Sequence, residues 1–137
     1  MKKLVLCALA AVGVLSGIST KAAEFSGSQK LICASVETYG CIMDFNCIKG
    51  TAETINIPQF FRIDFDKGLI HATRPDGEKR TTKIVNRTNE NGQIYLQGVQ
   101  SELGWSMAIN EETGKMSLTA SGDKVAYAVF GACATLK

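Results

Sequence analysis

The side chains of this sequence that could take part in acid–base chemistry are a single histidine, His71, and an aspartate pair, Asp64 and Asp66. A hydrolytic site needs a nucleophile, a base and an orienting group held together, and no Ser-His-Asp arrangement can be built from sequence neighbours. The two aspartates alternate with apolar residues, which predicts that both face the solvent. His71 is expected on the outer face of its strand. We therefore expect neither an enzyme nor a cofactor.

The cysteines are the other reactive residues, and their spacing favours disulfides over metal binding. Zinc ligands usually include close cysteine pairs two to four residues apart, whereas Cys33, Cys41, Cys47 and Cys133 are more widely spaced and form no Cys-x-x-Cys motif. Four cysteines in an exported chain are typical of a disulfide framework with three possible pairings. We favour Cys41–Cys47, which closes a short loop, and Cys33–Cys133, which ties the first strand to the last.

The N-terminus has the form of a secretory leader. Two lysines precede an apolar run from Leu4 to Leu15, and small residues follow that favour cleavage after Ala22. The run is shorter than the ~20 apolar residues that a membrane-spanning helix needs. We predict a signal peptide over residues 1–22 and a single domain over residues 23–137. The protein is expected to be periplasmic or secreted, with no membrane insertion after cleavage.

Removal of the leader reverses the sign of the net charge. The full chain has 15 basic and 13 acidic residues and a net charge of +2. Three of the lysines lie in the leader and no acidic residue does, so the remaining chain has a net charge of −1. A near-neutral domain without a basic run lacks the charge pattern of a nucleic-acid-binding protein. The basic pair Lys79-Arg80 is interpreted as a solvated strand end.

From Gln59 onward, apolar and polar residues alternate with a period of two, and turn sequences such as Asn91-Gly92 interrupt the alternation. This pattern predicts seven strands after Gln59 and an eighth near residues 30–36, with a helical turn near residues 51–55. Consecutive short turns favour a meander that closes on itself. We predict an all-β, disulfide-stapled fold, a small antiparallel up-and-down barrel of about eight strands, with a two-sheet β-sandwich as the alternative.

The alternation also predicts the residues that face the interior. These are Phe61, Ile63, Phe65, Ile70, Ile84, Ile94, Leu96, Trp105, Met107, Ile109, Met116 and Leu118. An eight-stranded barrel is either filled by its side chains or holds one small ligand. The bulk of this series favours a filled interior, and Trp105 and Tyr127 are the candidate walls of any cavity.

Several short segments give the mature chain its distinctive sequence. They are Phe61-Arg62-Ile63-Asp64, Gly104-Trp105-Ser106-Met107, Thr113-Gly114-Lys115-Met116, Ser121-Gly122-Asp123 and Phe130-Gly131-Ala132-Cys133. Together they resemble a group of small exported proteobacterial proteins of unknown function, which implies a secreted β domain and no particular activity. The segment from Ser121 and Gly122 to Tyr127 is also weakly similar to the Ser-Gly-x-x-Tyr loop of periplasmic C-type lysozyme inhibitors. Here four residues separate Gly122 from Tyr127 instead of two, and the Trp and Lys-Gly elements that follow in that family are absent.

Two binding functions remain open at this point. The first is a non-enzymatic binding or inhibitor module of the cell envelope, which captures an envelope protein through loops on a rigid scaffold. Its recognition residues would be Met43 and Phe45 in the Cys41–Cys47 loop, although Phe45 is equally suited to covering the end of the barrel. The second is a small carrier of an apolar ligand in the barrel interior, beside Trp105 and Tyr127. Ser121 and Gly122 complete the candidate binding residues.

Overall fold

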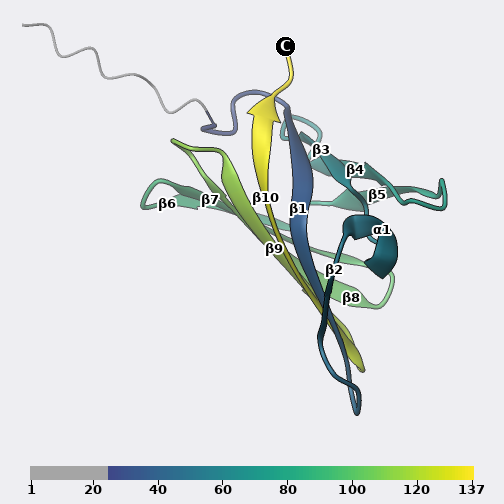
Figure 1. Cartoon of the computed structure of the whole chain (residues 1–137). Coiled ribbons are helices and arrows are strands. Elements are labelled where there is room, and N and C mark those ends of the chain that lie inside the picture. The colour runs from purple at the N-terminus through teal and green to yellow at the C-terminus, as the bar shows by residue number, and fades with distance from the viewer. Residues whose placement is uncertain (1–24) are drawn as a thin grey trace, which may run out of the picture.

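The computed structural model describes residues 25–137, so the predicted leader and Cys7 lie outside the described residues. These residues form ten strands and one short helix (Figure 1). The elements are β1 (Leu31–Ile42), β2 (Ile48–Gly50), α1 (Ala52–Ile55), β3 (Phe60–Asp64), β4 (Leu69–Thr73), β5 (Lys79–Lys83), β6 (Asn86–Glu90), β7 (Gln93–Gln100), β8 (Leu103–Asn110), β9 (Lys115–Ser121) and β10 (Val125–Thr135).

Nine strands form one curled antiparallel sheet in the order β5-β4-β3-β1-β10-β9-β8-β7-β6, and β2 pairs with β1 beside this path. The sheet curls into a half-barrel (Figure 1). Its two edge strands, β5 and β6, are separated only by Ile84 and Val85, and the Val85 N–H donates to the Gln97 carbonyl of β7 at 2.8 Å. One bent stretch of chain thus pairs first with β4 and then with β7, and it joins the two edges of the sheet. The prediction of an antiparallel, barrel-like all-β fold is confirmed.

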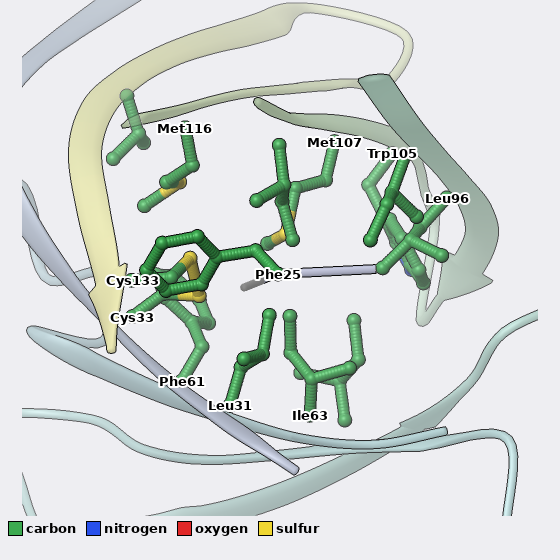
Figure 2. Packing of buried hydrophobic residues seen from close by; sticks show 14 residues of the cluster. Phe25, Leu31, Cys33, Phe61, Ile63, Leu96, Trp105, Met107, Met116 and Cys133 are labelled. Carbon is green, nitrogen blue, oxygen red and sulfur yellow. A yellow bond between two sulfur atoms is a disulfide. The ribbon is translucent and has the colours of Figure 1, made fainter. Parts of the chain in front are cut away.

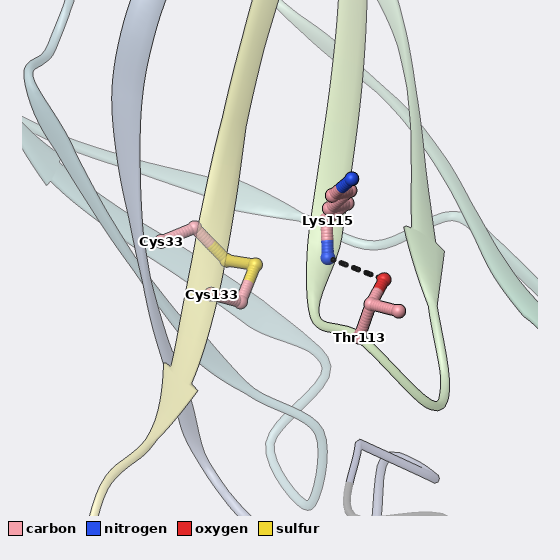
Figure 3. Close-up of a disulfide and its surroundings, with 4 residues drawn as sticks. All are labelled: Cys33, Thr113, Lys115 and Cys133. Carbon is pink, nitrogen blue, oxygen red and sulfur yellow. Dashed lines mark hydrogen bonds between the residues drawn. A yellow bond between two sulfur atoms is a disulfide. The ribbon is translucent and has the colours of Figure 1, made fainter.

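The first and last strands lie side by side along most of their length (Figure 1). Cys33 of β1 faces Cys133 of β10, and the predicted disulfide between them links positions 100 residues apart (Figure 3). The turn before β9 packs against this seam, because the Cys133 N–H donates to the Gly114 carbonyl at 2.8 Å. In the same turn the Lys115 N–H donates to Thr113 Oγ1 at 3.3 Å (Figure 3). The second predicted bridge, Cys41–Cys47, is also confirmed.

All twelve residues predicted to face inward lie in the core or pack directly against it. The prediction succeeds because a period of two, in phase with the strand pairing, places alternate side chains on one face. Sequence reasoning missed Phe25, whose ring lies in the middle of the cluster (Figure 2). Phe25 is held there by its own N–H, which donates to the Glu111 carbonyl at 3.1 Å. Gly114 has a φ of +68°, and a Cβ there would lie 2.8 Å from the Phe25 ring.

The prediction that Asp64 faces the solvent is wrong, whereas Asp66 and His71 are exposed as expected. Asp64 is only 7% exposed. It lies at the end of β3, where its carboxylate turns back to accept the Lys67 N–H at 3.1 Å and contacts Lys30 Nζ at 3.0 Å. The Lys30 ammonium, followed by the Lys67 N–H, lowers the pKa of the Asp64 carboxyl below its usual value, against the opposing effect of burial.

Candidate functional site

One end of the barrel contains a largely apolar cavity of about 210 Å³. Its apolar walls come from several strands and from the segment after α1, and include Ile57, Phe61, Ile70, Trp105, Leu118 and Val129. An engineered cavity of roughly 150 Å³ is large enough to bind benzene. This cavity therefore has room for one ring or a short chain.

Three of the inward-facing residues at this end of the strands are small, and they leave room for the cavity among larger neighbours. Ala72 of β4, Thr82 of β5 and Ala120 of β9 all line it. The opposite end carries Ile63, Ile94 and Ile109, which are buried in the same cluster as Phe25. Figure 2 shows Ile63 close to Phe25. Protein interiors are otherwise close-packed, so small side chains at these three positions leave a space that their neighbours do not fill.

Helix α1 positions one wall of the cavity. The Thr51 hydroxyl accepts the Thr54 N–H at 3.2 Å, and the Thr54 hydroxyl in turn accepts the Thr51 N–H at 2.9 Å, which caps the predicted helical turn. The turn ends at Asn56, whose φ of 56° places it in the left-handed region. The chain then passes directly into Ile57 and Pro58 at the cavity.

Trp105 is the largest side chain in the cavity wall, and two neighbours fix its position. Its indole Nε1–H donates to Thr82 Oγ1 at 3.2 Å, and the Thr82 hydroxyl donates to the Val99 carbonyl at 3.2 Å. Gly98 lies opposite Trp105 on β7, and any side chain at Gly98 would overlap the indole ring. The indole ring is therefore held in place, and its buried N–H keeps a hydrogen-bond partner.

Two arginines also line the cavity, and both were missed by the sequence reasoning. Arg80 lies opposite Ala72, and Arg74 directly follows β4 on the same inward face. The interpretation of Lys79-Arg80 as a solvated strand end is correct only for Lys79, because Arg80 is half-buried and faces the interior. Ile84 was predicted to face inward. Counting back from Ile84 in steps of two, through Thr82, would have identified Arg80 as inward-facing too.

Glu78 holds the two guanidinium groups together. Its Oε2 accepts from Arg74 Nη1 at 2.9 Å and from Arg80 Nη2 at 3.0 Å. The hydrogen bond from Arg80 is the main cause that lowers the pKa of Glu78, and a hydrogen bond from the Glu78 N–H is the main cause that lowers the pKa of Asp76. Both carboxylates therefore stay charged beside the arginines in neutral solution.

The structure brings Trp105 and Tyr127 together in the cavity wall, where they were predicted to lie if a cavity existed. Ser121 and Gly122 do not line the cavity. They lie at the turn between β9 and β10, where the Gly122 N–H donates to the Val125 carbonyl at 2.9 Å.

The Cys41–Cys47 loop is next to that turn, because the Met43 N–H donates to the Lys124 carbonyl at 2.8 Å. It forms the lower tip of the molecule in Figure 1. Met43 is 55% exposed and Phe45 78% exposed, and Ile42 and Ile48 are also exposed. Phe45 therefore does not cover the end of the barrel. The loop presents an apolar surface that the disulfide holds together.

Within residues 25–137, no group of three or more His, Cys, Asp or Glu side chains is arranged to hold a metal ion. No helix in the same range has both the length and the apolar character needed to cross a membrane. No family model matches the chain, and neither the curated proteins nor the solved structures contain a significant match.

Proposed function

We propose that the protein is a non-enzymatic binding protein of the cell envelope that carries a small, mainly apolar ligand in the cavity at one end of its barrel. The observation that supports this proposal is the cavity of about 210 Å³, which combines an aromatic wall at Trp105 with a few polar groups at one side. Apolar pockets with a small number of convergent polar groups are the usual form of small-molecule sites. The predicted leader and the two disulfides favour an oxidising compartment outside the cytoplasm.

The physical reason for binding is the empty space itself. Atoms that line a void lack dispersion partners on one side, and an apolar ligand restores those contacts while leaving water. A ligand that binds only the folded state also stabilises it, by about 2.7 kcal/mol at a hundred times its Kd. Binding should therefore appear as an increase in melting temperature.

The test uses the protein purified after export, titrated with 1-octanol as a neutral apolar probe. We expect quenching or a spectral shift of Trp105 fluorescence, because Trp105 is the only tryptophan and lines the cavity. The melting temperature should rise by several degrees at saturation. Ala120→Leu should fill the cavity, remove both responses and stabilise the free protein by about 1–2 kcal/mol from the added buried carbons.

The matched control is Ala126→Leu, on the exposed face of β10. This variant should respond to 1-octanol like the wild type. The carrier function would be refuted by a wild-type protein that responds neither to 1-octanol nor to its carboxylate analogue, octanoate, and so would an Ala120→Leu variant that binds the probe unchanged.

A second function is favoured by a separate observation, the exposed apolar residues of the Cys41–Cys47 loop. Surface clusters of this kind commonly mark protein-interaction sites. The double variant Met43→Ser/Phe45→Ser should lose capture of an envelope protein that wild-type protein retains on a column. Its melting temperature and its 1-octanol binding should be unchanged, because both side chains lie in solvent. Undiminished capture would exclude the loop as the recognition element.

A further inference from the structure

We propose that the ligand of this cavity is a short-chain or single-ring carboxylic acid, whose carboxylate is bound by Arg74 and Arg80 while its apolar body lies beside Trp105. This inference rests on the proposed carrier function and specifies its ligand. It follows from the placement of the two arginines, from their unused hydrogen-bond donors and from the size of the space.

Both arginines face the interior of the barrel. Arg80 is an inward-facing residue of β5, and Arg74 directly follows β4 on the same face as Ala72. Their side chains are only 22% and 28% exposed. Burial of a charged group is unfavourable unless its hydrogen bonds are satisfied, so two such residues at the cavity require partners.

The available partners leave donors unused. The Nε atoms of Arg74 and Arg80 are buried, and neither has a hydrogen-bond partner among residues 25–137. Glu78 accepts one Nη–H from each arginine, and Asp76 Oδ2 is 3.6 Å from Arg74 Nη2. Both acidic side chains are about half exposed, which places them nearer the solvent than the arginines.

A carboxylate is the group that these donors fit best. A guanidinium has five N–H donors and no acceptor, and an ionised carboxylate is acceptor-only, with two oxygens that match the planar fork. A hydroxyl would bring a further donor to a site that already has too many. An amide would do the same. The ligand is therefore expected to be an acid and not its neutral analogue.

The size of the cavity limits the apolar part. Sites for drug-sized molecules usually measure about 300–1,000 Å³, and this cavity measures about 210 Å³. A long acyl chain would not be enclosed, whereas a short chain or one ring can reach Trp105 from the arginines. Octanoate is a suitable probe, and 1-octanol is its neutral counterpart.

The experiment compares the affinities of octanoate and 1-octanol at neutral pH by calorimetry or Trp105 fluorescence. Wild-type protein should bind octanoate at least tenfold more tightly than 1-octanol. Arg80→Met and Arg74→Met should each remove most of this preference, measured as the ratio of the two affinities in the same variant, because Met keeps an apolar stem but has no hydrogen-bond donor. Arg62→Met, at an exposed position of β3, is the matched control and should keep the full preference.

Arg80→Lys is a second variant that keeps the test decisive if Arg80→Met does not fold. It keeps the positive charge but loses the planar fork of the guanidinium. It should retain part of the preference for octanoate. If the wild type binds both probes equally, the inference is overturned while the carrier function stands. If the wild type binds neither probe, the carrier function itself is wrong.

Discussion

The two ends of this barrel are made by the same alternating strands but are filled differently. Near the Cys33–Cys133 bridge, the Phe25 ring fills the interior (Figure 2), together with Ile63, Ile94 and Ile109 of the same cluster. At the other end, Ala72, Thr82 and Ala120 leave a cavity lined by arginines and Trp105. We call these the closed end and the open end.

The difference separates stability from binding. We expect the filled core and its covalent bridge to stabilise the fold more than the open end does, since the open end contains an unfilled space and two half-buried charges. Functional sites commonly contain such locally unfavourable features, which the rest of the structure supports. Variants of the closed end should therefore lower stability, and variants of the open end should alter binding.

The largest effect is expected from the closed-end disulfide. Cys33→Ser/Cys133→Ser should lower the free energy of unfolding by about 4–5 kcal/mol, because the bridge closes a loop of about a hundred residues in the unfolded chain. Cys41→Ser/Cys47→Ser, which opens only the small loop at the tip, should cost about 2 kcal/mol. Chemical denaturation of both variants measures the two losses in unfolding free energy. Equal losses would contradict the expectation that the Cys33–Cys133 bridge stabilises the fold more than the bridge at the tip.

Phe25→Ala should have the next largest effect. Removal of a buried phenylalanine ring from a packed core costs about 3–5 kcal/mol, and Phe25 lies in the middle of the closed-end cluster. Leu118→Ala is the comparison at the open end, where the side chain is partly buried beside an existing cavity. It should cost less in thermal or denaturant unfolding. A Phe25→Ala variant as stable as wild type would show that the ring does not hold this end closed.

The smallest effect is a pH dependence at the closed end. The lowered pKa of Asp64 means that its contact with Lys30 stabilises the fold fully above the unfolded-state pKa, about 3.9. This contribution is lost as the pH falls through the folded-state pKa. Asp64→Asn should therefore melt below wild type at pH 6–7, by a few degrees at most, and the difference should shrink below about pH 4.

Asp66→Asn, at an exposed position two residues on, is the control for this pH series and should follow the wild-type curve. The measurement is the melting temperature of wild type, Asp64→Asn and Asp66→Asn between pH 3 and 7. A constant difference between wild type and Asp64→Asn across that range would contradict the assignment.

Much of the closed end could be predicted from the sequence, because alternation with a period of two fixes which side chains share a face. Ile63, Ile94 and Ile109 were identified in this way, and the spacing of the four remaining cysteines indicated both bridges. Phe25 was missed because it stands alone between the leader and the first strand, with no periodic neighbours. Asp64 was misplaced because the turn after β3 decides its burial, and alternation does not describe turns.

The open end was harder to predict for a different reason. A cavity depends on the summed volumes of side chains that come from several strands, here including Ala72 and Ala120. The sequence of a single strand does not show that this sum is too small to fill the interior. Trp105 was predicted to face the interior and was named with Tyr127 as a wall of any cavity, but the bulk of the inward-facing residues favoured a filled interior. Arg74 and Arg80 share the inward phase of Thr82, yet their charge suggested solvent.

The pairing of β1 with β10 also determines when the barrel can be completed. The first strand must wait for the last eleven-residue strand before its longest ladder of hydrogen bonds can form. Contacts between segments so distant in the chain slow folding. The barrel therefore cannot close until β10 has been synthesised, and this order is compatible with the predicted export of the chain before it folds.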